Sequence, residues 1–273
     1  MYSLGIRKRQ FYLLIGKEVA DQMNNKERFS DRVDSYVKYR PSYPVEAIDY
    51  MYGTIGLKPA STIADIGAGT GIMSELLLAR GSTVIAVEPN MEMRLAAESR
   101  LSGNAQFRVQ SSPAEETGLQ AQSVDYIVCA QSFHWFDQRL AKEEFKRILK
   151  PEGKVILIWN SRLTEGTPFL VKYDELLHTY GTDYNEVKHT NITSDMLRSF
   201  FKNGELHEVE FPNRQIFDYE GLSGRLQSSS YSPPPGHPNY EPMMNALLEL
   251  FDSYQQEGQV YFEYTTQIFW GEV

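Results

Sequence analysis

Three glycines stand at alternate positions, Gly67, Gly69 and Gly71, between an apolar run and a helical pattern in the stretch TIADIGAGTGIMSELL. Glycines at this spacing let a backbone pass close to a ligand, as in the loops that hold dinucleotides and phosphates. The dinucleotide pattern G-x-G-x-x-G places its third glycine where Ile72 stands, and the Gly-Lys-Ser/Thr of a phosphate loop is missing. By itself, the loop also fits an ordinary tight turn between a strand and a helix.

Two carboxylates accompany these glycines. Asp65 lies just before the loop, and Glu88 ends the next apolar run. At the end of a second strand, a carboxylate can accept hydrogen bonds from both hydroxyls of a ribose. Two acids and no basic residue in the loop suit a ligand that is nucleoside-like, free of phosphate and cationic. S-adenosylmethionine, with its sulfonium and ammonium groups, has this chemistry.

The elements that must position these residues alternate along the chain. We predict strands at 62–66, 83–88, 105–110, 124–130, 154–159, 205–211 and 259–273, and helices between the first five at 72–80, 90–101 and 137–149. Continuous β-branched runs separated by helices indicate a parallel sheet buried on both faces, which binds ligands at the carboxyl ends of its strands. We therefore predict an α/β fold with a doubly wound, mostly parallel seven-stranded sheet, an antiparallel C-terminal edge strand and a helical cap.

This pattern divides the chain into four parts. Residues 1–22 begin like a signal peptide but have too short an apolar run, so we set them apart as an N-terminal extension. Residues 23–160 form the predicted ligand-binding core with an N-terminal lid. Residues 161–204 are a predicted helical cap insert. Residues 205–273 are expected to complete the sheet and to contribute to the pocket for a second substrate, which we call the acceptor.

The composition narrows the classes of partner. The 273 residues carry a net charge of −9 without a basic cluster in the folded part, which disfavours nucleic acid as a partner. A single cysteine, Cys129, rules out an internal disulfide and fits a reducing compartment, so we expect a cytoplasmic protein. No apolar run approaches the roughly 20 residues that cross a bilayer, so no membrane partner is expected. We expect a monomer or a homodimer.

Five stretches carry a resemblance to a known family. DIGAGTG, VIAVEPNMEMR, SSPAEETGL, SVDYIVCAQSFHWFD and EFKRILKPEGKVIL resemble, in this order, the motifs of class I S-adenosylmethionine-dependent methyltransferases. The resemblance covers roughly residues 28–160 and points to the type 11 small-molecule subgroup, which includes the trans-aconitate methyltransferase-like proteins. It implies S-adenosylmethionine as the cofactor, S-adenosylhomocysteine as its product and a Rossmann-like fold.

The resemblance also implies roles for particular residues. Glu88 would hold the ribose, Met91 would form an apolar wall on the adenine, and Gln131 would approach the methionine end. Many relatives have an aspartate where this chain has Pro113, so the contact with the adenine amino group would pass to Glu115 or to a backbone carbonyl. The residues implied to contact the cofactor are Tyr39, Arg40, Asp65, Gly67, Ala68, Gly69, Glu88, Pro89, Met91, Ala114, Glu115 and Gln131.

Methyl transfer is an in-line displacement at an activated carbon, so the enzyme has mainly to align the reactants and exclude water. A general base is needed only when the acceptor arrives protonated. His134 is the candidate base, with a purely structural role beside Trp135 as the alternative. The candidate acceptor-binding residues are Tyr36, Trp135, Arg225 and Tyr231. The histidines show no paired metal-ligand spacing, so no metal is expected.

The predicted class of acceptor depends on a motif that this chain lacks. Methyltransferases of amino groups and nucleic-acid bases carry an Asn/Asp-Pro-Pro-Tyr/Phe motif after the fourth strand, where this chain has AQSF. We therefore predict O-methylation of a carboxylate or a hydroxyl on a small organic acceptor. Two alternatives stay open at this point: a protein that binds S-adenosylmethionine without transferring methyl groups, and a nicotinamide-dependent oxidoreductase.

Overall fold

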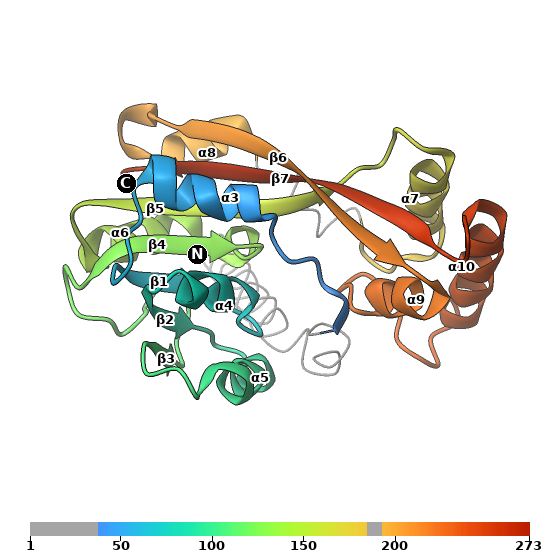
Figure 1. Cartoon of the computed structure of the whole chain (residues 1–273), viewed down its shortest axis with the longest axis horizontal. Coiled ribbons are helices and arrows are strands. Elements are labelled where there is room, and N and C mark those ends of the chain that lie inside the picture. Colours follow the sequence, from blue (N-terminus) through green and yellow to red (C-terminus); the bar gives the residue numbers. More distant parts are fainter. Residues whose placement is uncertain (1–37, 185–192) are drawn as a thin grey trace, which may run out of the picture.

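The computed structural model describes residues 38–184 and 193–273 of the chain. These residues form a seven-stranded sheet in the order β3-β2-β1-β4-β5-β7-β6 (Figure 1). The predicted extension 1–22 and the candidate residue Tyr36 lie outside the described residues. The strands are β1 (Thr62–Ile66), β2 (Thr83–Val87), β3 (Phe107–Gln110), β4 (Val124–Ala130), β5 (Leu149–Arg162), β6 (His207–Phe217) and β7 (Val260–Gly271).

Side-chain caps mark where several helices begin. Asn90 accepts a hydrogen bond from the Met93 amide at the start of α5, and Asp137 does the same for α6. Thr167 caps α7, where Pro168 takes the first helical position. The helices are α3 (Val45–Tyr50) with a π-turn at Met51–Ile55, α4 (Ile72–Ala79), α5 (Met91–Leu101), α6 (Gln138–Ile148), α7 (Pro168–Tyr180), α8 (Ser194–Phe200), α9 (Tyr219–Gln227) and α10 (Tyr240–Tyr254), with short 3-10 turns at Phe133–Trp135 and Lys202–Gly204.

The central strands β1, β2, β4 and β5 are buried on both faces, as their apolar runs predict, whereas the edge strands β3 and β6 are largely exposed or half-buried. On one face, Ile63 and Ile156 pack with Leu77 of α4 and Ile48 of α3. On the other face, the neighbouring strand positions pack with Phe145 of α6 and with α8. This confirms the doubly wound arrangement and accounts for the continuous apolar runs of β1, β2, β4 and β5.

The chain order reverses beside β1, which pairs in parallel with β2 on one side and with β4 on the other. The carboxyl ends of these three strands therefore meet where the crossover helices diverge to opposite faces. Open α/β sheets bind ligands in the crevice that forms at this point. The glycine loop after β1, Glu88 after β2 and the segment after β4 all begin there.

The C-terminal strands complete the predicted mostly parallel sheet. Strand β7 is antiparallel to both β5 and β6, and it lies between them, so that β6 forms the outer edge. Strands β5 and β6 run beyond their predicted ends at residues 159 and 211. The extra residues of β5, Asn160 to Arg162, are polar and gain their strand structure by pairing with β7.

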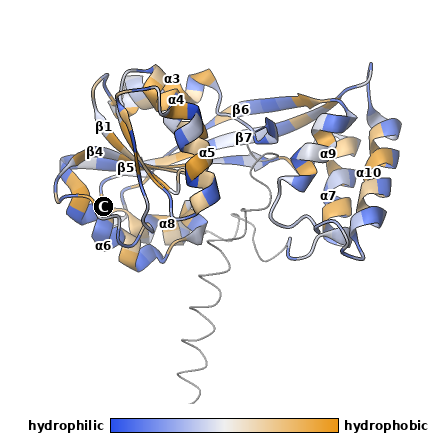
Figure 2. Ribbon diagram, turned by 90° about the horizontal axis from the view of Figure 1, so that it is seen from below, coloured by the Kyte–Doolittle hydropathy of each residue, from blue (hydrophilic) through white to orange (hydrophobic). Residues whose placement is uncertain are grey.

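The far ends of β6 and β7 carry a separate helical group. Figures 1 and 2 show α7, α9 and α10 gathered there, at a distance from the helices that cover the main sheet. These helices share a third apolar core, in which Leu170, Leu222 and Leu247 pack with Phe262 of β7. Helix α7 falls within the predicted helical cap insert, 161–204, whereas α9 and α10 fall within 205–273. Their attachment to two long strands places all three across from the glycine loop. No helix of the described residues is long and apolar enough to cross a membrane.

Candidate functional site

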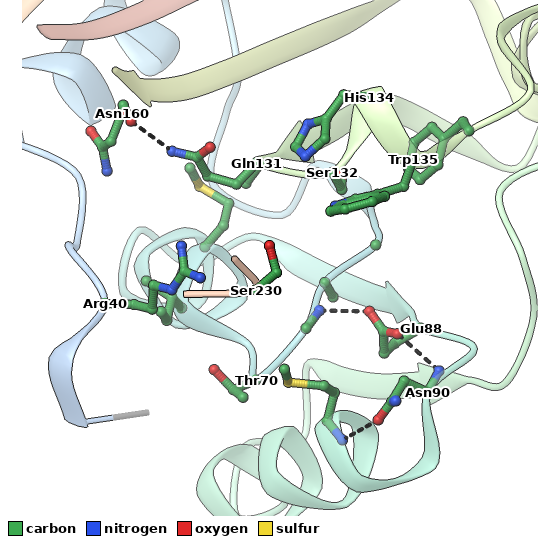
Figure 3. A pocket seen from close by; sticks show the side chains of 18 of the residues that line it. Arg40, Thr70, Glu88, Asn90, Gln131, Ser132, His134, Trp135, Asn160 and Ser230 are labelled. Atoms are coloured by element: carbon green, nitrogen blue, oxygen red, sulfur yellow. Dashed lines mark hydrogen bonds between the residues drawn. The ribbon is translucent and has the colours of Figure 1, made fainter. Parts of the chain in front are cut away.

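A cavity of about 720 Å³ lies at the carboxyl ends of the parallel strands. Its size falls in the range of small-molecule sites, which is about 300–1,000 Å³. One end is formed by the glycine loop and the segments after β2 and β4, and the other by side chains from β5, α7, α9 and β7. Figure 3 shows how Glu88, Gln131, His134 and Arg40 surround it.

The glycine loop combines one crowded position with one open position. Gly67 has a φ of 69°, and a Cβ atom there would lie 2.5 Å from the Cβ of Ser132. Gly69 has a φ of 56°, but a Cβ there would meet nothing within 4 Å. Gly67 is therefore required by the packing of the loop against the segment after β4. Gly69 lines the cavity and leaves open space in which a ligand can approach the backbone.

Glu88 is held by the backbone on both of its carboxylate oxygens. Its Oε2 accepts a hydrogen bond from the Gly69 amide at 2.8 Å, and its Oε1 accepts one from the Asn90 amide at 2.9 Å (Figure 3). The residue is 8% exposed, and this burial raises its pKa although the two amide bonds act to lower it. Each oxygen keeps a further lone pair, so the carboxylate can also accept from the hydroxyls of a ribose.

Two buried oxygens beneath the loop lack a hydrogen-bond partner. Asp65 is fully buried, and its Oδ2 accepts from the Ser74 hydroxyl at 2.7 Å, while its Oδ1 has no partner. Burial, together with the nearby Glu88, raises the pKa of Asp65 to about 7. Thr70 Oγ1 is likewise buried without a partner. Native structures pair most buried polar atoms, so these two oxygens, unpaired among the described residues, are positions where a water or a polar ligand can bind.

These features fit S-adenosylmethionine. Its ribose hydroxyls match the spare lone pairs of Glu88, and its cationic groups match two buried acids with no basic residue in the loop. The open side of Gly69 admits a ligand close to the backbone. Asp65 does not itself line the cavity, so it is placed behind the loop and not in direct contact with the space that a ligand would fill.

Among the residues predicted to contact the adenine of the cofactor, one lies elsewhere than expected. Pro89, Ala114 and Glu115, which are predicted to contact the cofactor, line the cavity, and so does Ala68 in the loop. Met91 does not line it and is 55% exposed, whereas Met93 lines it and is buried. The reason is the cap of α5 at Asn90, because it points the first helical residue outward and the third inward.

His134 and Trp135 both line the cavity from the 3-10 turn that follows β4. The Nδ1 of His134 lies 3.5 Å from the indole Nε1 of Trp159, and its ring lies 4.8 Å from that of Trp135. Gln131, just before this turn, has a φ of 59°, and its Nε2 donates to the backbone oxygen of Asn160 at 3.2 Å. Such a conformation in a residue other than glycine is held by its surroundings and is frequent at functional sites.

The segment before α3 ties the two parts of the molecule together. Arg40 lines the cavity and donates to the backbone oxygen of Ser228 at 2.8 Å. Tyr39 does not line the cavity. Its ring packs on Gly224 of α9, where a Cβ atom would lie only 2.0 Å away, and its hydroxyl donates to Glu220 at 3.1 Å.

Arg225 is the most unusual group at the far end of the cavity. It is 6% exposed, and it donates to the hydroxyls of Tyr264 at 3.2 Å and Ser229 at 2.8 Å. Among the residues that the structure describes, none forms an ion pair with it. Burial acts to lower its pKa, but the neighbouring phenol groups of Tyr264, Tyr231 and Tyr173 raise the pKa above its ordinary value, so the guanidinium stays charged.

A second buried arginine was not predicted. Arg162 donates to Asp174 at 2.5 Å and to the Tyr184 hydroxyl at 2.7 Å, and all three line the cavity beside the predicted Arg225 and Tyr231. The sequence offers no signal for this group, because its members are scattered and join only through β5 and α7. In the described part of the chain, no cluster of three or more His, Cys, Asp or Glu could hold a metal ion.

Comparisons with known proteins agree with this geometry. The model of a methyltransferase domain family matches residues 64–157. The chain is 39% identical over 185 residues to an uncharacterized methyltransferase of Mycobacterium bovis, a match that covers 68% of this chain and 70% of the relative. An uncharacterized methyltransferase of Schizosaccharomyces pombe is 34% identical over 150 residues, which cover 55% of this chain and 58% of the relative.

Solved structures show the same fold. A protein from Anaeromyxobacter dehalogenans described as a type II methyltransferase superposes with a TM-score of 0.64 at 21% identity, over 86% of this chain and 98% of the other. These findings confirm the family resemblance of the motifs and support methyl transfer over the two alternatives left open by the sequence.

Proposed function

The chain belongs to the class I S-adenosylmethionine-dependent methyltransferases, and we propose that it methylates an oxygen atom of a small acceptor that carries a carboxylate. Arg225 carries this proposal, as a buried guanidinium that lines the cavity and has only neutral hydrogen-bond partners among the described residues. A buried charge without a counter-charge costs several kcal/mol, and such groups cluster at binding sites. An anionic acceptor would supply the missing charge.

S-adenosylmethionine supplies a methyl group that is already activated by its sulfonium. The residues of the chain then have to bind, orient and exclude water. Glu88 would hold the ribose, while the charge of Asp65 would favour the cationic part of the donor. Arg225 would orient the acceptor from the opposite end of the cavity, because a planar guanidinium binds a carboxylate through two parallel hydrogen bonds.

A small acceptor also agrees with the charge and the connectivity of the chain. The net charge of −9 disfavours polyanions such as nucleic acid, while the buried Arg225 and the mostly buried Arg162, which pairs with Asp174, still suit a small anion. We further propose that residues 23–160 hold the donor and that residues 161–204 and 205–273 mainly form the acceptor end.

The test uses S-adenosylmethionine labelled in its methyl group and a metabolite extract separated on an anion exchanger. We expect label to enter a product only with the retained, anionic fraction. We expect Arg225→Met to lower kcat/KM for that fraction by about 10- to 150-fold, which corresponds to the roughly 1.5–3 kcal/mol of a charged hydrogen bond.

Arg214→Met is the matched control, since it removes an exposed arginine of β6 that pairs with Glu263. This variant should transfer label at the wild-type rate. Labelled product from the neutral or cationic fraction alone, or equal activity of the two variants, would contradict the proposal.

A further inference from the structure

Tyr231 is fixed in the cavity beside Arg225 by its backbone and by its ring. Its carbonyl oxygen accepts a hydrogen bond from the Thr182 amide, just after α7, at 3.1 Å. Its ring contacts that of Tyr184 edge to face, with the centroids 4.9 Å apart. The side chain lines the same cavity as the glycine loop. Tyr231 is thus fixed at the arginine-rich end of the cavity by its backbone and its ring.

The charges around this phenol are mostly positive. Arg225 from α9 and Arg162 from β5 are the two largest electrostatic influences, and Arg40 from the segment before α3 adds to them. Ser229 links Tyr231 to Arg225, since its hydroxyl hydrogen-bonds the phenol and accepts from Arg225 at 2.8 Å. The remaining titratable groups of the cluster are Asp174, Tyr173 and His178 of α7, Tyr184 after it and Tyr264 of β7.

A neutral phenol would leave this cluster with three guanidiniums and one carboxylate, that of Asp174. Burial acts to raise the pKa of Tyr231, but the arginines and Ser229 outweigh it and lower the pKa below its ordinary value. The phenols of the neighbouring Tyr173 and Tyr184 have raised pKa values instead, mainly through burial. Of the phenols in the cluster, Tyr231 is therefore the one that ionises most readily. Its phenolate and Asp174 would face three guanidiniums, so the cluster keeps a positive charge for an anionic acceptor.

We propose that Tyr231 is a catalytic residue whose phenolate oxygen takes the proton of an acceptor hydroxyl. The O–H bond of the acceptor breaks, and its proton goes to Tyr231. The electron pair that is freed forms the bond to the methyl carbon, and the pair of the broken carbon–sulfur bond leaves with the sulfur. The proton passes from Tyr231 to water after the product leaves, which restores the phenolate.

This inference rests on the proposed function and narrows it to one kind of oxygen. A carboxylate nucleophile needs no base, so a base at this place would have no part in its methylation. A hydroxyl is protonated at neutral pH and gains from a base in contact with it. The acceptor is then a hydroxy acid or an enol acid, whose carboxylate is held by the arginines and whose hydroxyl is methylated.

The first experiment follows the near-ultraviolet tyrosinate absorbance of the protein without substrate, from neutral to alkaline pH. In the wild type we expect one tyrosine to ionise in a more acid range than the others. Tyr231→Phe should lack this step, and the matched control Tyr184→Phe should keep it. Arg225→Met should move it to higher pH. Identical titrations of the wild type and Tyr231→Phe would overturn the inference.

The second experiment treats the methyl-labelled product with mild alkali, which releases methanol from a methyl ester but leaves a methyl ether intact. We expect a stable product, and a kcat for Tyr231→Phe that is about 100-fold or more below the wild type, with unchanged affinity for S-adenosylmethionine. Release of labelled methanol would overturn the inference and leave the proposed function standing. No transfer to any anionic acceptor would overturn both.

Discussion

The two ends of the cavity carry opposite charges and are built in different ways. The donor end holds two buried acids, Asp65 and Glu88, and is made largely of backbone amides within one stretch of the chain. The end that we propose for the acceptor holds the buried Arg225 and the mostly buried Arg162, which come from distant segments of the chain. A cationic donor and an anionic acceptor would each meet a complementary charge, so the same cavity can hold both in a fixed order.

The two ends also differ in what their residues have to do: those of the donor end maintain the packing of the loop, and those of the acceptor end select the acceptor. At the donor end, the glycines must satisfy the packing of the loop as well as the ligand. At the acceptor end, the side chains form a network of hydroxyls and charges on a scaffold that the third apolar core supports. Substitutions at the donor end should therefore change stability and cofactor affinity. Substitutions at the acceptor end should change the binding and turnover of the acceptor but not the affinity for the cofactor.

The largest effect on stability is expected for Gly67→Ala. The new Cβ would lie 2.5 Å from Ser132 Cβ, at a φ of 69° that side chains disfavour. Strain and overpacking together should lower the free energy of unfolding by about 2–4 kcal/mol. Denaturant unfolding of the cofactor-free protein measures this change.

Gly69→Ala is the matched control within the same loop. Its φ of 56° is also positive, but its Cβ would meet nothing within 4 Å. Stability should fall only by the backbone strain of about 1–2 kcal/mol. Cofactor affinity should fall as well, because the methyl group enters the cavity. Equal losses of stability in the two variants would show that packing does not distinguish the two glycines.

The next largest effect is expected on the affinity for the cofactor. Glu88→Ala removes a carboxylate that two amides orient, and we expect S-adenosylmethionine to bind about 10- to 150-fold more weakly, which corresponds to about 1.5–3 kcal/mol. Glu75→Ala, which removes an exposed carboxylate paired with Arg100, should bind as the wild type does. An unchanged dissociation constant for Glu88→Ala would mean that Glu88 does not hold the ribose.

A further effect concerns the pH dependence of stability at the donor end. Burial raises the pKa of Asp65 from 3.8 to about 7, so the folded protein binds its proton more tightly than the unfolded chain does. This contribution to stability is present below pH 4 and is lost as the pH rises to about 7, by at most about 1.4 kcal/mol per pH unit.

Asp65→Asn removes this titration. The difference in unfolding free energy between the wild type and Asp65→Asn should therefore decrease as the pH rises from about 4 to about 7, and level off above it. Saturating S-adenosylmethionine should reduce the decrease, because its cationic groups favour the ionised carboxylate. Parallel profiles for the two proteins would show that Asp65 keeps an ordinary pKa.

The donor end could be predicted from the sequence because each of its structural requirements involves residues that are close together in the chain. A crowded turn requires Gly67, a helix start requires a cap at Asn90, and buried parallel strands require continuous apolar runs. The boundaries of β1, β2 and β4 followed closely from those runs. The outward position of Met91 could not be predicted, since it depends on where the cap starts the helix.

The acceptor end was predicted only in part, at Arg225 and Tyr231. Arg162 and Asp174 join through the polar extension of β5, which has no strand pattern of its own and forms only by pairing with β7. The pairing of β5 with β7 joins residues about a hundred positions apart, so no short sequence motif indicates it. The position of β7 between β5 and β6 depends on the same long-range contacts.

The central claim is that donor and acceptor are bound at separate ends of opposite charge. Calorimetric titration of S-adenosylmethionine into the wild type, Glu88→Ala and Arg225→Met tests it most directly. The account predicts that Glu88→Ala loses about 10- to 150-fold in affinity and that Arg225→Met binds as the wild type does. A loss in Arg225→Met as large as that in Glu88→Ala would contradict it, because the arginine would then serve the donor.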